Sequence, residues 1–199
     1  MYSQNNEEQV IVDFFKQFKG KLIDIGANDG ITLSNSRKLI ELGWTADLVE
    51  PAPEPFAKLK ELYKENNNIT LHNCAISDFT GTTNFYVSGE HLGKGDSGLL
   101  STLSLSDKNK WENRTKYHSI DISTYTWKDF NKSEYDFINI DAEGYDLCIL
   151  NQMNLNKLNT KMICVEHNGI DTNLYIDYLT SYKFKIILIN NENLIGVLD

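Results

Sequence analysis

The stretch KLIDIGANDG, residues 21–30, carries the clearest structural signal in this chain. Its first five residues form a short apolar run, interrupted by Asp24, that is typical of a buried strand. Gly26 and Gly30 then allow the backbone to turn sharply and to approach a ligand closely. A buried strand that feeds a glycine turn predicts the first strand and the ligand-binding loop of a parallel α/β sheet. A turn with a purely structural role is the alternative interpretation of the two glycines.

The apolar residues on both sides of this stretch predict alternating strands and helices. Helical spacing occurs at residues 7–19, 31–42, 53–63, 124–130, 145–153 and 171–181. Short apolar or alternating runs predict strands at residues 21–25, 45–50, 69–76, 82–87, 117–122, 135–140, 162–166, 184–189 and 194–198. Repeated strand–helix units predict a mostly parallel sheet with helices on both faces, which binds its ligand outside the carboxyl ends of the strands.

The composition is that of an ordinary globular domain. The chain has 199 residues, 41% of them hydrophobic, and we expect a single domain over residues 1–199. The chain ends one residue after its last predicted strand, as a domain excised from a longer protein would. Its 19 basic and 28 acidic residues give a net charge of −9 without a basic cluster. This balance argues against a partner that is bound through nucleic-acid phosphates.

The cysteines and the hydropathy pattern indicate the cellular compartment in which the protein is expected. Cys74, Cys148 and Cys164 are few, odd in number and never spaced as CxxC, so they predict free thiols rather than disulfides or a zinc site. No apolar stretch approaches the roughly 20 residues that span a bilayer, and the polar, acidic N-terminal residues do not form a signal peptide. We therefore expect a cytoplasmic protein without a membrane span.

The ends of the second and third predicted strands carry residues that suit a nucleoside. Glu50 follows the glycine turn by about 20 residues, where an acidic residue accepts both hydroxyls of a ribose; a solvated carboxylate is the alternative. Ser77 and Asp78 follow the third strand, where a polar pair either binds an adenine edge or starts an Asx turn. Asn28 occupies the position at which dinucleotide-binding loops have glycine, so a pyrophosphate has less room.

Acidic and imidazole side chains follow the next two buried strands. Asp141 and Glu143 come directly after the strand at residues 135–140, and Glu166 and His167 lie at the end of the next. Because the carboxyl ends of parallel strands share one edge of the sheet, these side chains are predicted to lie near the ligand. Helix N-capping is the alternative role of Asp141 or Glu143, and a structural role is the alternative for His167.

Four motifs together resemble the FkbM family of S-adenosylmethionine-dependent methyltransferases. They are IDIGANDG at residues 23–30, VEPAPEPF at 49–56, AISD at 75–78 and INIDAEG at 138–144, and the resemblance covers about residues 20–168. It implies a Rossmann-like, seven-stranded class I methyltransferase fold whose C-terminal hairpin adds an antiparallel strand. It also implies S-adenosylmethionine as methyl donor and a hydroxyl acceptor, often on a sugar or a polyketide.

The resemblance implies a role for each cofactor-binding position. The methionine half of the donor would contact the first strand and its turn, at Asp24, Gly26, Ala27, Asn28 and Gly30. Glu50 would bind the ribose, and Ser77 and Asp78 would lie at the adenine end. The family often has lysine where this chain has Asn139, a position that we expect to point away from the ligand.

The chemistry requires alignment of donor and acceptor and removal of the acceptor's proton. Alignment is worth about 7–11 kcal/mol of the barrier, and general-base assistance about 10²–10⁴-fold in rate. We predict His167 as the base, because an imidazole takes up a proton near pH 7, with Glu143 as the second candidate and Asp141 at the same strand end. The alternative is a divalent cation, Mg²⁺, Ca²⁺ or Mn²⁺, held by Asp141, Glu166 and His167.

Residues 88–110, rich in Gly, Ser and Lys, have no clear period. With Trp111 and Tyr117 they are predicted to form the acceptor wall, because long loops in compact domains often bind ligands and aromatic faces with polar neighbours suit a sugar. We expect an O-methyltransferase that acts on a sugar or glycan hydroxyl. The alternatives are a methyltransferase for a non-sugar small molecule or a nitrogen, a nucleotide-binding oxidoreductase, and a non-catalytic domain that binds S-adenosylmethionine.

Overall fold

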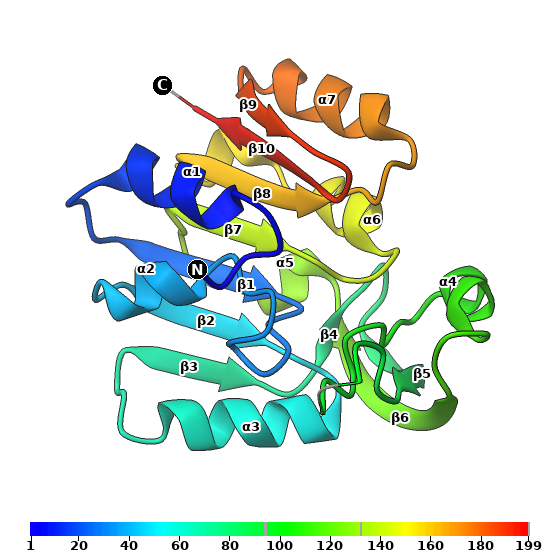
Figure 1. The fold of residues 1–199 in the computed structure, drawn as a ribbon. Helices are drawn as coiled ribbons and strands as arrows, with labels where there is room; N and C mark the ends of the chain where they lie inside the picture. Colours follow the sequence, from blue (N-terminus) through cyan, green and yellow to red (C-terminus); the bar gives the residue numbers. More distant parts are fainter. Residues whose placement is uncertain (94, 132, 199) are drawn as a thin grey trace.

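The computed structural model of the chain describes residues 1–93, 95–131 and 133–198. A seven-stranded sheet with the order β3-β2-β1-β7-β8-β10-β9 forms its centre (Figure 1). The strands are β1 (Lys21–Ile25), β2 (Thr45–Val49), β3 (Ile69–His72), β7 (Phe137–Ile140), β8 (Met162–Glu166), β9 (Lys185–Ile189) and β10 (Asn193–Val197). Only β10 runs antiparallel to its neighbours in this sheet. The predicted parallel sheet with an antiparallel C-terminal hairpin is therefore confirmed.

Helices cover both faces of this sheet (Figure 1). One face packs against α1 (Glu7–Phe15), α2 (Arg37–Glu41) and α3 (Pro53–Tyr63). The other packs against α5 (Trp127–Phe130), α6 (Asp146–Leu150) and α7 (Thr172–Ser181). Successive residues of a strand point to opposite faces of the sheet, so the side chains of one strand pack alternately into two separate hydrophobic cores.

A smaller sheet lies beside the carboxyl ends of the main strands (Figure 1). It has the order β4-β6-β5, with β4 (Ala75–Ile76), β5 (Gly81–Ser88) and β6 (Tyr117–Tyr125). The prediction of one strand over residues 69–76 is therefore wrong, because β3 and β4 belong to different sheets. The break lies at Asn73, whose side-chain amide donates to the carbonyl oxygens of Glu50 (2.9 Å) and Pro51 (3.1 Å).

Two further predictions from the hydrophobic pattern are corrected. The helix expected at residues 31–42 is reduced to α2, and Leu33, with a φ of +55°, lies in a non-helical turn before it. The segment 88–110 is not irregular throughout, since it contains most of α4 (Leu105–Trp111). The Ser104 hydroxyl caps α4 by accepting from the backbone N–H of Asp107 at 3.2 Å. No residue of α4 is buried, so it shows no apolar stripe. A 3₁₀ turn (Leu155–Lys157) precedes β8.

Within the described ranges, none of the helices is long and apolar enough to cross a membrane. The expected cytoplasmic location stays a prediction, as does the assignment of residues 1–199 to a single domain.

Candidate functional site

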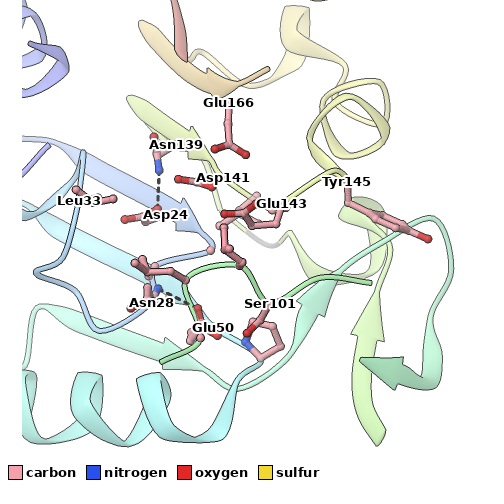
Figure 2. Close-up of a pocket in the computed structure, with 18 of the residues that line it drawn as sticks. Asp24, Asn28, Leu33, Glu50, Ser101, Asn139, Asp141, Glu143, Tyr145 and Glu166 are labelled. Atoms are coloured by element: carbon pink, nitrogen blue, oxygen red, sulfur yellow. Dashed lines mark hydrogen bonds between the residues drawn. The ribbon is translucent and has the colours of Figure 1, made fainter. Parts of the chain in front are cut away.

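A cavity of about 270 Å³ opens at the carboxyl ends of β1, β2, β7 and β8 (Figure 2). It brings together most of the strand-end residues that the sequence singles out, namely Asp24, Gly26, Ala27, Asn28, Glu50, Asp141, Glu143 and Glu166. Gly30, Ser77, Asp78 and His167 are not among the described residues that line it.

The glycine turn after β1 forms one wall of the cavity. Gly26 has a φ of +92°, and a Cβ built on it would lie 1.7 Å from the backbone oxygen of Asp141. Only glycine is compatible with this close approach between the β1 and β7 ends. The backbone N–H groups of Gly26 and Ala27 both donate to Val49 O, at 2.9 and 3.0 Å, which ties the turn to the end of β2.

Glu50 joins the turn to the second strand end. Its Oε2 accepts from the backbone N–H of Asn28 at 2.9 Å, and its Oε1 accepts from that of Ala52 at 2.6 Å. Burial raises the pKa of Glu50 to about 7. A carboxylate has about four lone-pair sites, so two acceptor sites remain after these backbone bonds. Glu50 thus fixes the turn and retains the capacity to accept from a ligand.

Asp24 lies in the cavity beside Asn139, which the sequence analysis did not assign to the site. The Asn139 side-chain amide donates to Asp24 Oδ1 at 2.8 Å, and the Ser36 hydroxyl donates to Oδ2. Asn35 in turn donates to Asn139 Oδ1 at 3.2 Å. The expectation that residue 139 points away from the ligand is wrong, because Asp24 and Asn139 are register partners in β1 and β7 and share one face. Burial raises the pKa of Asp24.

Three carboxylates form an acidic edge of the cavity, where β7 and β8 end. Asp141, Glu143 and Glu166 each offer an oxygen, and these atoms lie within 4.8 Å of one another. Burial, followed by the charges of the neighbouring carboxylates, raises the pKa of each of the three groups. These residues include both acids that the sequence analysis named as catalytic candidates.

His167 lies outside this group. Its Nδ1 accepts from the backbone N–H of Gly169 at 2.9 Å and lies 3.1 Å from the hydroxyl oxygen of Thr172. Its ring packs beside Tyr175, with 6.2 Å between the ring centroids, and burial lowers its pKa. The structure therefore places the imidazole against α7 rather than in the cavity.

The remaining predicted cofactor residues have structural contacts. A Cβ on Gly30 would lie 2.7 Å from Leu59 Cδ2, so this glycine allows the turn to pack on α3. Ser77 is fully buried and its hydroxyl donates to Phe79 O at 2.9 Å, whereas Asp78 is exposed. The preceding residues, Ala75 and Ile76, line the cavity instead.

The predicted acceptor wall contributes to the same cavity. From residues 88–111 the described lining residues are His91, Leu92, Gly98, Leu99, Leu100, Ser101, Leu103 and Trp111. The Thr102 hydroxyl donates to Glu143 O at 2.7 Å, which ties this segment to the acidic edge. Tyr117 supports the wall from behind, since its hydroxyl donates to Leu100 O at 3.0 Å.

Two lining residues come from parts of the chain that carry no motif. Gln4 precedes α1, and Glu192 lies in the turn between β9 and β10. The Asn5 side chain donates to Glu192 Oε2 at 2.9 Å, so the N-terminal segment is held at the rim of the cavity. No local signal indicates this role, because it depends on how the two chain ends meet.

Three solved structures that resemble this chain are methyltransferases. Methyltransferase FkbM from Methylobacillus flagellatus KT is 16% identical, with a TM-score of 0.62; the alignment covers 90% of this chain and 44% of that one. Precorrin-6y C5,15-methyltransferase from Geobacter metallireducens GS-15 is 12% identical, with a TM-score of 0.54, and the alignment covers 96% and 87% of the two chains. Ribosomal protein L11 methylase from Lactobacillus delbrueckii subsp. bulgaricus is 9% identical, with a TM-score of 0.55 and coverage of 96% and 76%. These likenesses confirm the class I methyltransferase fold.

No curated protein matches this chain. The chain spans less than half the length of the Methylobacillus protein. The family model described as the methyltransferase FkbM domain matches residues 24–186, from the first buried strand into the C-terminal hairpin. This match extends over most of the sequence, and the chain therefore belongs to the FkbM methyltransferase family.

Proposed function

We propose that this chain transfers a methyl group from S-adenosylmethionine to a hydroxyl group of a sugar or glycan. Family membership implies the methyl donor. The observation that carries the rest is the continuity of one cavity, which joins the glycine turn and Glu50 to the acidic edge and to the wall around Trp111. Donor and acceptor can meet there without crossing solvent, as group transfer requires.

The residues present suit the donor. Asp24 is a buried carboxylate that forms no ion pair with any described residue, so it would hold the ammonium group of the methionine half. Glu50 would accept from the ribose hydroxyls, and Ala75 and Ile76 offer an apolar surface for the adenine. When bound, the donor supplies a methyl group on a sulfonium that is already activated. The contribution of the chain is to orient the acceptor and exclude water.

The charge of the cavity favours a neutral acceptor. Six carboxylate side chains line it, Asp24, Glu50, Asp141, Glu143, Glu166 and Glu192, and among its described lining residues there is no Lys or Arg. Such a field repels phosphate and carboxylate groups. Trp111 and Tyr145 supply aromatic surface, and Ser101 and Asn168 supply hydrogen-bonding groups, which together suit a neutral sugar.

We assign the activation of the acceptor hydroxyl to the acidic edge rather than to His167. An alcohol must lose its proton during the transfer, and a group that assists must be within hydrogen-bond reach. Asp141, Glu143 and Glu166 line the cavity, and the imidazole does not. The predicted cation site is affected in the same way, because Asp141 and Glu166 line the cavity and His167 does not.

The test is a product assay with isotopically labelled donor and a panel of neutral glycans, non-sugar alcohols and amines. Methylation of the non-sugar alcohols or the amines alone, with no methylated glycan, would contradict the proposal. Glu143→Gln should lower kcat by about 10²–10⁴-fold. The loss of kcat in His167→Ala should be at least about tenfold smaller than that in Glu143→Gln. Binding of S-adenosylhomocysteine without turnover on any acceptor would indicate a non-catalytic binding domain instead.

A further inference from the structure

The acidic edge results from the register of two neighbouring strands. Ile140 of β7 pairs with Val165 of β8, so the next residues, Asp141 and Glu166, lie side by side where the strands end. Glu143 lies two residues after Asp141, in the turn before α6. Three oxygen atoms, one from each side chain, come within 4.8 Å of one another. Figure 2 shows Glu166 pointing toward Asp141, with Glu143 beside them.

Glu166 provides an independent indication of a missing partner. Glu166 as a whole is 9% exposed. Its Oε2 atom is buried and has no hydrogen-bond partner in the part of the chain that the structure describes. A buried carboxylate oxygen with no donor is strongly unfavourable, so native proteins rarely leave one unsatisfied. Asn168 interacts with the Glu166 side chain but leaves Oε2 unpaired. Because the carboxylate points toward Asp141, a cation between the three acids is within its reach.

The described side chains do not neutralise the cluster. None of the ion pairs among residues 1–93, 95–131 and 133–198 includes Asp141, Glu143 or Glu166. The charge of Lys110 favours the ionised form of Glu143, but the two groups are too far apart to form an ion pair. Three carboxylates held together without a cation repel one another, and a bound positive charge removes that repulsion.

Another carboxylate holds the turn that carries the cluster. Asp146 accepts from the backbone N–H groups of Ala142 (2.7 Å) and Gly144 (2.9 Å). Glu143 and Gly144 both have positive φ, of +48° and +99°. Asp146 is thus committed to the backbone of the turn, which leaves the side chains of the other three acids to bind a ligand.

We propose that Asp141, Glu143 and Glu166 bind one hard divalent cation, Mg²⁺, Mn²⁺ or Ca²⁺, at the acceptor end of the cavity. Oxygen-only donors select these ions over Zn²⁺, which prefers nitrogen and sulfur ligands. Opposite oxygen ligands of one such ion lie about 4–5 Å apart, given bond lengths of about 2.0–2.6 Å, so a single ion reaches all three atoms.

The role of the ion, but not its binding, rests on the proposed function. A hydroxyl that ligates a divalent cation has a lowered pKa, which would let an acceptor alcohol react near neutral pH. Binding to the cluster requires neither donor nor acceptor. The experiment therefore uses the chain alone with Mn²⁺ as probe, and its outcome is separate from that of the methyl-transfer assay.

Titration of the chain with Mn²⁺, followed by electron paramagnetic resonance of the free ion, should show one site that Mg²⁺ or Ca²⁺ displaces. Glu166→Gln and Glu143→Gln should each weaken Mn²⁺ binding at least about tenfold. Glu192→Gln is the matched control, because Glu192 lines the same cavity outside the cluster, and its Mn²⁺ affinity should stay within about twofold of wild type.

Thermal unfolding provides a second measurement that does not depend on a folded variant being active. Mn²⁺ should raise the Tm of the wild-type chain and of Glu192→Gln, but not that of Glu166→Gln. In the absence of metal, Glu166→Gln should be at least as stable as wild type, because it removes an acid whose charged form is disfavoured by burial and by the neighbouring carboxylates. The proposal is overturned if Mn²⁺ does not bind the wild-type chain, or if both glutamine variants bind it as tightly as wild type does.

Discussion

The side-chain amide of Asn139 donates a hydrogen bond to Asp24 Oδ1 at 2.8 Å, across the register of β1 and β7. This contact holds a carboxylate that lines the cavity, but an amide carries no charge and does not neutralise the carboxylate. A lysine at residue 139 would neutralise Asp24 from within the protein. With asparagine there, the positive charge can come from the ligand instead.

Asp24→Asn should therefore weaken binding of S-adenosylhomocysteine by about 10–100-fold, as expected when a charge-assisted hydrogen bond is replaced by a neutral one. Calorimetric titration measures the effect. Asp47→Asn, on the neighbouring strand β2, is the control, since Asp47 does not line the cavity. Equal losses of affinity in the two variants would show that Asp24 acts only through stability.

Gly26→Ala should destabilise the fold by at least about 3 kcal/mol, because the added Cβ would overlap the Asp141 carbonyl and the φ of +92° is strained for alanine. Gly93→Ala is the matched control. Its φ is +70°, but the added Cβ meets no described atom within 4 Å, so only the backbone strain of about 1 kcal/mol applies. Urea denaturation compares the two, and similar values would contradict the close approach of β1 to β7.

The ligand-free protein should lose stability as the pH rises from about 4.5 to about 7. The pKa of Glu50 is raised from 4.5 to about 7 in the folded state, so the folded protein retains a proton that the unfolded chain releases. The contribution of Glu50 is fully present below pH 4.5 and is lost through pH 7, a change of about 3 kcal/mol. Burial raises the pKa of Asp24 in the same direction.

Unfolding free energies measured between pH 5 and pH 8 test this dependence. Glu50→Gln should flatten the slope, whatever its effect on absolute stability. A wild-type stability that increases over this range would show that the site carboxylates are not protonated in the folded state.

Asp47 should stabilise the fold with the opposite pH dependence. Although burial opposes it, hydrogen bonds from His72 and Lys21 hold the pKa of Asp47 at about 2, below its ordinary value of 3.8. Its carboxylate is 2.7 Å from Lys21 Nζ, and the Tyr135 hydroxyl donates to it at 3.0 Å. Its contribution is thus present above pH 3.8 and lost as the pH falls toward 2.

Asp47→Asn should reduce the free energy of unfolding by about 2 kcal/mol at pH 7, because it removes the negative charge and one of the two acceptor oxygens that bind Lys21, His72 and Tyr135. The difference from wild type should shrink as the pH falls toward 2. Guanidinium denaturation at several pH values measures it, and a constant difference would contradict the assigned pKa.

Several elements follow directly from the local pattern. The apolar run at residues 21–25 becomes β1, and the strand-end residues Glu50, Asp141 and Glu166 do meet at one edge of the sheet. Parallel strands make this meeting inevitable once the strands are recognised. The pattern did not reveal that residues 69–76 divide between two sheets, because the amide of Asn73 that marks the break makes contacts distant in sequence.

Periodicity, glycine turns and short motifs are local properties of the chain, so they were enough to predict the class of fold, the family and the edge of the sheet at which the cavity opens. Which side chains face the cavity depends on tertiary contacts. Register placed Asn139 beside Asp24, packing on α7 turned His167 away, and the turn held by Asp146 brought Glu143 to Glu166. Each of these outcomes depends on the pairing of distant segments, which no local pattern encodes.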